Sequence, residues 1–273
     1  METSGLDTAR LVRFRTAIDS VVSFDKRDRV GIGMQKEKTM HAVIKNYVDP
    51  DPLHQEVPVG RYIADICDAQ QHRITEVQTA NFGLLREKLT AFLPEYQVTV
   101  IYPIAHRKTV TWIDPETGEL AASNVSHTTG SFYDVFRELY RISGYLCEPN
   151  LTIEPLLIDM TEYRLQDGWS RDGKRGSHRF DRMPEGLYDD LVLHDAADYA
   201  AFLPPDLPEE FTAKEFGEAV GIHRRSLSYS TVLRMLSDLG VVERIGQTQR
   251  RAYIYRELLH NETGRDFSRR KHR

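Results

Sequence analysis

The chain of 273 residues has only two cysteines, Cys67 and Cys147, and they lie far apart in the sequence. Two such thiols form neither a disulfide framework nor a cysteine-based zinc site. Long apolar runs are also missing: no stretch approaches the length that spans a bilayer, and the first residues, METSGLDTARLVRFR, lack the apolar segment of a signal peptide. These absences predict a protein of the reducing cytoplasm with no membrane partner.

The charges are unevenly distributed along the chain. The formal net charge is -5, which by itself argues weakly against binding to nucleic acids. From residue 223 to residue 273, however, there are 12 Arg and Lys residues against 5 Asp and Glu residues. A local excess of positive charge is what phosphate binding requires, although basic chain ends are often solubilising tails. This segment is therefore a candidate nucleic-acid contact that needs support from other features.

Residues 209–258 predict a helix, a turn, a second helix and a two-stranded hairpin, followed by a basic tail at 259–273. Thr212 is a candidate N-cap and Gly221 a candidate C-cap of the first helix. This order resembles a winged helix-turn-helix domain, a fold that binds DNA in many proteins and docks other proteins in some. The resemblance implies DNA contacts from the second helix and the hairpin, made by Arg224, Arg225, Tyr229, Ser230, Arg250 and Arg251.

The first part of the chain predicts an α/β fold. A helical extension is expected at residues 1–30, and a second helix carries the apolar stripe of Met40, Val43, Ile44 and Tyr47. Strands and a further helix alternate after it: strands at 55–60, 61–68, 73–79, 97–104 and 109–114, and a helix at 82–93. This alternation predicts a mixed sheet with flanking helices over residues 31–160.

Residues 161–208 are expected to form a basic, glycine-rich loop and then a connecting helix that ends at the proline-rich segment LPPDLPEE. The loop, QDGWSRDGKRGSHRF, carries Arg171, Lys174 and Arg175. These cations could bind a phosphate backbone. A surface loop without a ligand is an equally good interpretation of the same residues.

The stretch ITEVQT, residues 74–79, places the polar side chains of Glu76 and Gln78 on one face of an expected strand. It pairs with YIADICD around a polar turn, and a symmetric hairpin brings Asp65 opposite Glu76. Facing carboxylates repel each other unless a cation compensates, and Mg²⁺ prefers such hard oxygen ligands. Solvated carboxylates on an exposed hairpin are the alternative interpretation.

An Asp on one strand, a Glu-x-Lys on the next and a helix directly afterwards resemble the PD-(D/E)XK nuclease superfamily, which has a restriction-endonuclease-like fold. Here the motif reads Asp65, then Glu76-Val77-Gln78, and Glu37 matches the Glu that these enzymes usually have on the preceding helix. The resemblance implies that Asp65 and Glu76 bind Mg²⁺ or Mn²⁺, that Glu37 assists, and that Gln78 positions the attacking water. The nuclease-like block and the winged helix together also resemble an uncharacterised bacterial family with both parts.

The sequence departs from the nuclease pattern at Gln78, where the superfamily has lysine. A glutamine amide can orient water but has no charge to offset the negative charge that develops during hydrolysis. Lys36, Lys38 or Lys108 is a candidate for the missing cation.

Three functions follow from these patterns. The first is a Mg²⁺-dependent DNA endonuclease, the second is a catalytically inactive nuclease-fold protein that regulates transcription by binding DNA, and the third is a protein-interaction adaptor. RNA stays open as a substrate. Cleavage of both strands of a duplex needs two active sites, which favours a homodimer.

Overall fold

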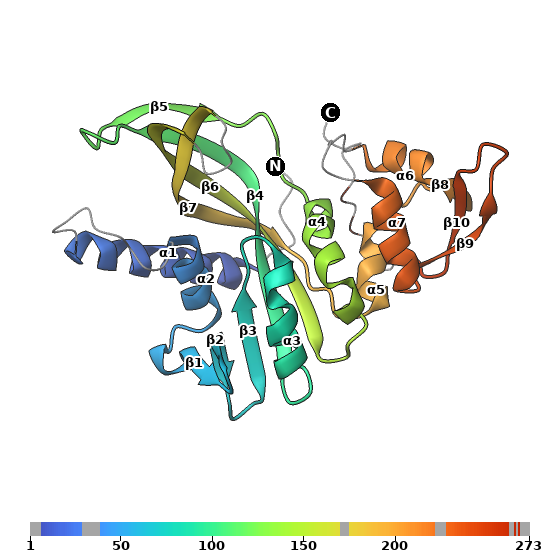
Figure 1. The fold of residues 1–273 in the computed structure, drawn as a ribbon, viewed down its shortest axis with the longest axis horizontal. Coiled ribbons are helices and arrows are strands. Elements are labelled where there is room, and N and C mark those ends of the chain that lie inside the picture. Colours follow the sequence, from blue (N-terminus) through green and yellow to red (C-terminus); the bar gives the residue numbers. More distant parts are fainter. Residues whose placement is uncertain are drawn as a thin grey trace. The chain divides into compact units, whose positions relative to one another are not determined.

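The structure is a computed structural model that describes residues 7–28, 39–169, 175–221, 228–261, 265 and 267. The chain divides into two compact units, each assembled from segments that are distant in the sequence. Unit 1 comprises Met1–Thr79, Ile101–Gly130 and Pro155–Leu191. Unit 2 comprises Ala80–Val100, Ser131–Glu154 and Val192–Arg273. The predicted mixed α/β architecture is confirmed, because a large sheet with flanking helices is present (Figure 1).

The large sheet has seven strands among the described residues, in the order β1-β2-β3-β4-β6-β7, with β5 paired to β4. The strands are β1 (Gln55–Val59), β2 (Tyr62–Asp68), β3 (Arg73–Val77), β4 (Gln97–Ile113), β5 (Leu120–Val125), β6 (Leu151–Trp169) and β7 (Arg175–Asp190). The sequence predicted two strands where β4 is continuous. His106 and Arg107 interrupt the apolar pattern there, but the Asp159 carboxylate lies 2.8 Å from His106 Nδ1 and accepts a hydrogen bond from the Arg107 N–H.

The loop predicted around residues 166–180 is wrong for most of its length. Strand β6 extends to Trp169 and strand β7 starts at Arg175, and these two residues pair directly. Glycines and charges indicated a loop, but the backbone hydrogen bonds of an antiparallel pair do not depend on side-chain polarity. Strand β7 is the last strand of the sheet and contains Pro184 beside a register shift, which is where a proline can be accommodated.

Two helices of unit 1, α1 (Thr8–Asp28) and α2 (Thr39–Val48), pack with the sheet around one apolar core. The predicted stripe on the second helix is confirmed, because all four of its residues are buried in this core. The sheet residues of the same core are Val77, Ile101, Leu156, Ile158, Met160 and Leu187. Within the described ranges, no helix combines the length and the apolar character needed to cross a membrane.

Gly130 passes close to the backbone of β4, and its N–H donates a hydrogen bond to the His106 carbonyl oxygen. A Cβ added at Gly130 would lie 2.1 Å from the carbonyl oxygen of Ala105. Gly130→Ala is therefore expected to lower the free energy of unfolding by about 3 kcal/mol, because backbone atoms would have to shift. Urea denaturation measures this loss. Gly186→Ala, where no atom lies within 4 Å of the added Cβ, is the control; equal unfolding midpoints for the two variants would contradict the prediction.

Unit 2 contains short helical segments held together by aromatic side chains. They are η2 (Phe82–Leu85), α3 (Arg86–Phe92), η3 (Phe132–Val135), α4 (Phe136–Leu139), η4 (Tyr140–Tyr145), α5 (Ala196–Tyr199) and η5 (Ala200–Phe202). The ring of Phe202 contacts those of Tyr133 and Phe136, and the Tyr133 hydroxyl donates to the Phe202 carbonyl oxygen. The helix predicted at 82–93 corresponds to η2 and α3.

The C-terminal part of unit 2 contains α6 (Ala213–Val220), α7 (Tyr229–Asp238) and a sheet in the order β8-β10-β9. Its strands are β8 (Glu210–Thr212), β9 (Val242–Gln247) and β10 (Tyr253–Glu257). The predicted caps of the first helix are confirmed: Thr212 forms a capping box with Glu215, and Gly221 has a φ of 67° in the left-handed region. Strand β8 was not predicted, because three residues give too little periodicity.

Candidate functional site

The hairpin of β2 and β3 has the predicted register. Ile66 pairs with Thr75 and Cys67 with Ile74, and the same register places Asp65 across from Glu76. Each of these two carboxylates also contacts the backbone of the facing strand: the Asp65 N–H lies 3.4 Å from Glu76 Oε1, and the Val77 N–H donates to Asp65 Oδ2 over 2.7 Å. The two acidic side chains that the sequence singled out are therefore neighbours.

Both carboxylates are largely withdrawn from water. Glu76 is 2% exposed and the Asp65 side chain is 15% exposed. The interpretation of solvated carboxylates on an exposed hairpin is therefore wrong. A buried carboxylate costs free energy unless hydrogen bonds or cations compensate, so this pair requires compensation.

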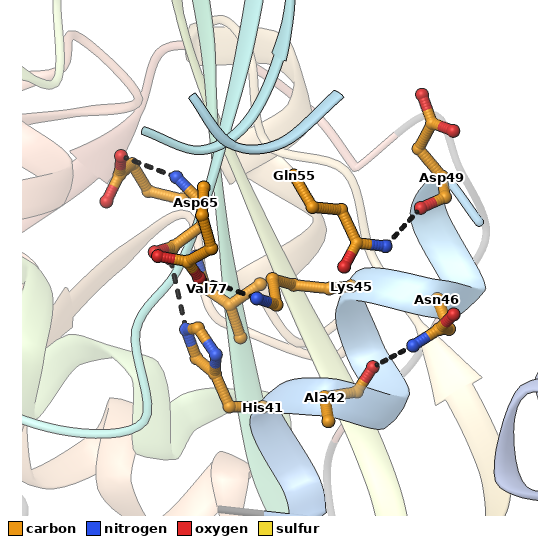
Figure 2. Close-up of polar contacts among 10 residues, drawn as sticks. His41, Ala42, Lys45, Asn46, Asp49, Gln55, Asp65 and Val77 are labelled. Carbon is orange, nitrogen blue, oxygen red and sulfur yellow. Dashed lines mark hydrogen bonds and ion pairs between the residues drawn. The ribbon is translucent and has the colours of Figure 1, made fainter. Parts of the chain in front are cut away.

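Helix α2 places two basic side chains beside the hairpin. His41 Nε2 lies 3.1 Å from Asp65 Oδ2, and Lys45 Nζ donates to Glu56 Oε1 over 2.6 Å. Figure 2 shows both side chains pointing from α2 toward Asp65 and Val77. They are four residues apart and so share one face of the helix. Lys45 is only 2% exposed, which makes it a buried cation in this part of unit 1.

One helical turn after Glu37, His41 could reach a metal site but was expected to be a packing or surface residue, and Lys45 was not singled out. The available signal was their position: His41 and Lys45 adjoin the apolar stripe of α2, where buried charged side chains need partners. Lys108, one candidate for the missing cation, instead lies with Glu162, 3.8 Å from its carboxylate. Lys36, Lys38 and the candidate catalytic Glu37 lie outside the described residues.

Gln78 follows β3 directly and is half-buried. Its backbone N–H donates to the Ile101 carbonyl oxygen of β4 over 2.9 Å, so the position is fixed by the sheet although it lies beyond the strand. Its role as a water-positioning residue stays a prediction.

The carboxylate oxygens of Asp65 and Glu76 are the hard ligand type that Mg²⁺ prefers. Among the residues that the structure describes, no group of three or more His, Cys, Asp or Glu side chains is placed to hold a metal ion. Mg²⁺, however, usually keeps several waters and is bound through one or two carboxylates together with substrate phosphates. Asp65 and Glu76 provide two such carboxylates, with His41 positioned to orient the first.

The predicted DNA contacts in unit 2 have different surroundings. Arg250 and Arg251 are exposed in the turn between β9 and β10, and Ser230 is exposed in the first turn of α7. The ring of Tyr229 instead packs against Phe216 of α6, with ring centroids 5.9 Å apart, and a Cβ at Gly217 would lie 2.5 Å from it. Tyr229 thus joins the two helices.

Arg171, Lys174, Arg224 and Arg225 lie outside the described residues. Arg175 starts β7, where its backbone pairs with Trp169.

Comparison with known proteins identifies the family of the chain. The model of the family described as "Domain of unknown function (DUF8091)" matches residues 38–194, more than half of the chain. An "Uncharacterized protein" of Treponema pallidum (strain Nichols) is 27% identical over 191 residues, which cover 70% of this chain and 75% of that protein. No solved structure matches the chain. The chain belongs to the DUF8091 family, and the matched segment contains α2, the β2–β3 hairpin and both of its carboxylates.

Proposed function

We propose that the chain is a metal-dependent phosphodiesterase that cleaves DNA, with Asp65 and Glu76 as ligands of Mg²⁺ or Mn²⁺. The observation that carries the proposal is the pairing of these two carboxylates, both withdrawn from water, across the β2–β3 hairpin. The order of elements in this part of the chain, α2, β1, β2, β3, α3 and β4, agrees with the nuclease superfamily that the motif resembles. In both, the strands with Asp and Glu follow one helix and precede another.

The residues around the carboxylates have separate roles in this proposal. Asp65 and Glu76 would hold the metal, which when bound would supply positive charge near the phosphate and lower the pKa of a water. The Val77 N–H and His41 hold the Asp65 carboxylate in one orientation, as hydrogen bonds to ligating carboxylates commonly do. Lys45 brings a cation to the same side of α2, and the Gln78 amide orients the attacking water.

The C-terminal part of unit 2 supplies affinity for DNA in this proposal. Its order, β8, α6, α7, β9 and β10, is consistent with a winged helix-turn-helix domain. The exposed guanidinium groups of Arg250 and Arg251 lie in the turn between the last two strands, where the wing of such a domain meets phosphates. Phosphate contacts of this kind position the protein on DNA without reading its sequence.

A DNA-binding regulator with an inactive nuclease-like unit is the second candidate. The observation that favours it is Gln78, because an uncharged amide replaces the lysine of the superfamily motif. In this case Asp65 and Glu76 would be structural, held by their backbone hydrogen bonds and by α2.

Cleavage assays on the full chain test the proposal. Labelled supercoiled, linear and single-stranded DNA, and an RNA of the same sequence, are incubated with Mg²⁺, Mn²⁺ or EDTA. The proposal expects cleavage of DNA with either metal and none with EDTA. Salt-sensitive DNA binding without cleavage would instead identify the regulator, and the absence of both would leave the adaptor.

The variant Gln78→Lys tests the role assigned to the glutamine. Lysine restores the charge of the superfamily motif, so the cleavage rate is expected to rise by about tenfold or more, which corresponds to about 1.4 kcal/mol of transition-state stabilisation. Gln71→Lys, an exposed glutamine in the turn of the same hairpin, is the matched control. Equal rates for the two variants would show that Gln78 has no part in the chemistry.

A further inference from the structure

Glu162 of β6 is a fully buried carboxylate surrounded by cations from three strands. Arg164 Nε donates to its Oε1 over 2.7 Å, Arg182 Nε lies 3.3 Å from Oε2, and Lys108 Nζ lies 3.8 Å from Oε2. Arg179 Nε adds a fourth contact at 3.4 Å. Burial of Glu162 opposes its ionisation, but the hydrogen bond from Arg164 and the charges of the other cations outweigh it and hold the pKa below its ordinary value.

This cluster has more positive charge than its carboxylate can neutralise. In the part of the chain that the structure describes, Lys108, Arg164 and Arg182 form ion pairs with Glu162 and with no other carboxylate. These three cations and the one carboxylate leave an excess of two positive charges, with Arg179 not counted. The pKa of Lys108 is lowered by burial and by repulsion from the neighbouring arginines, even though Glu162 acts in the opposite direction.

The cluster is centred on β6, beyond the last residue of that strand in the apolar core. Leu156, Ile158 and Met160 alternate along β6 and face the core formed with α1 and α2. The same row continues with Glu162 and Arg164. The arginines of the cluster are between 24% and 47% exposed, so their guanidinium groups remain accessible to a ligand.

The first turn of α2 connects this cluster with the carboxylate pair inside unit 1. Thr39 Oγ1 donates to Asp181 Oδ2, directly beside Arg182 in β7. His41, two residues further along the same turn, lies against Asp65. One helical turn therefore contacts both β7, next to Arg182 in the sequence, and the candidate metal ligand Asp65. A strand of nucleic acid presents a phosphate at every nucleotide, so one strand offers phosphates to both places.

We infer that Lys108, Arg164 and Arg182 bind backbone phosphodiester groups of the DNA that flank the phosphate at Asp65 and Glu76. This inference rests on the proposed DNA substrate. It assigns Glu162 the role of positioning the cations: the carboxylate holds the guanidinium groups together without cancelling their charge. The contacts are to phosphates, so they contribute affinity and not base specificity.

Fluorescence anisotropy of the full chain with a labelled duplex in EDTA tests the inference independently of cleavage. Lys108→Gln removes one charge from the edge of the cluster, and the slope of log affinity against log salt is expected to become shallower by about 1. The affinity at 0.1 M salt is expected to fall by about fivefold to tenfold. Arg15→Gln, an exposed arginine paired with Asp19 on α1, is the matched control and is expected to leave both unchanged.

A second variant separates electrostatics from folding. Glu162→Gln removes the negative charge, so DNA affinity is expected to rise several-fold even as thermal stability falls. Damage to the fold alone cannot raise affinity. Unchanged or weaker binding by Glu162→Gln, or identical salt slopes for Lys108→Gln and Arg15→Gln, would overturn the inference.

The remaining outcomes separate this inference from the proposed function. Absence of cleavage with the Lys108-dependent salt slope retained would refute the nuclease and keep the phosphate site. Cleavage together with a salt slope that Lys108→Gln leaves unchanged would keep the nuclease and refute the phosphate site. Inorganic phosphate is added in a separate arm at constant ionic strength. If phosphate displaces the duplex no more strongly than chloride does, the site binds phosphates of a polymer. If phosphate displaces it more strongly and Lys108→Gln abolishes the difference, the site is one for free phosphate.

Discussion

Asp65→Asn is expected to lower metal-dependent DNA cleavage by a factor of about 10³ or more while the protein stays folded. Asparagine keeps an oxygen that can accept the hydrogen bond from the Val77 N–H, which now spans 2.7 Å to Asp65 Oδ2. It loses the negative charge that would attract the divalent cation of the proposed site. In that site, loss of one carboxylate ligand would remove several kcal/mol of transition-state stabilisation, which sets the size of the expected effect.

The control for this prediction is Asp68→Asn on the same strand. Asp68 forms an ion pair with Arg73 across the hairpin, 3.6 Å apart, and has no role in the proposed site. Its cleavage rate should equal that of the wild type. DNA binding in EDTA should be the same for both variants. Cleavage by Asp65→Asn at the wild-type rate would show that Asp65 is not part of the proposed active site.

Glu162→Ala is expected to have the largest effect on stability, a loss of about 3–5 kcal/mol in the free energy of unfolding. Removing the carboxylate leaves cations close together with no compensating charge, and a cavity replaces the fully buried side chain. Urea denaturation measures the change. Glu243→Ala in β9 removes a half-exposed carboxylate that pairs with Arg256 and should cost less than about 1 kcal/mol. A similar cost for both variants would show that the Glu162 cluster contributes little to stability.

The contribution of Glu162 also depends on pH in a definite direction. Its pKa in the folded protein lies below the ordinary value of 4.5. The unfolded chain therefore takes up the proton first as the pH falls, and the stabilisation present at neutral pH is lost as the pH passes through the folded pKa. Glu162→Gln has no such group. The stability difference between wild type and Glu162→Gln should shrink between pH 7 and acid pH, and a difference that is independent of pH would contradict this account.

Local signals in the sequence were sufficient to predict the elements that depend on neighbouring residues. The apolar stripe of α2 follows the helical repeat, and Thr212 and Gly221 are residue types that cap helices wherever they occur. The register of the β2–β3 hairpin also follows from symmetry about a polar turn, so the pairing of Asp65 with Glu76 could be predicted.

Contacts between distant segments could not be predicted in the same way. Lys108, Arg164 and Arg182 come from three strands, and only the order of β4, β6 and β7 in the sheet brings them to Glu162. The polar sequence of β7 gave no indication of a strand, because its hydrogen bonds come from pairing with β6. The contact of His41 with Asp65 likewise depends on how α2 packs on the sheet.

The alternation of the two units along the chain affects how the protein can form during synthesis. The chain leaves unit 1 after Thr79, returns at Ile101, leaves again after Gly130 and returns at Pro155. Unit 1 is therefore complete once residue 191 has left the ribosome. The rings of Tyr133 and Phe136 pack against the ring of Phe202, which is synthesised later. Both rings therefore lack this partner in the nascent chain until residue 202 emerges. A fragment that ends before residue 202 would lack this partner permanently, and we expect such fragments to aggregate.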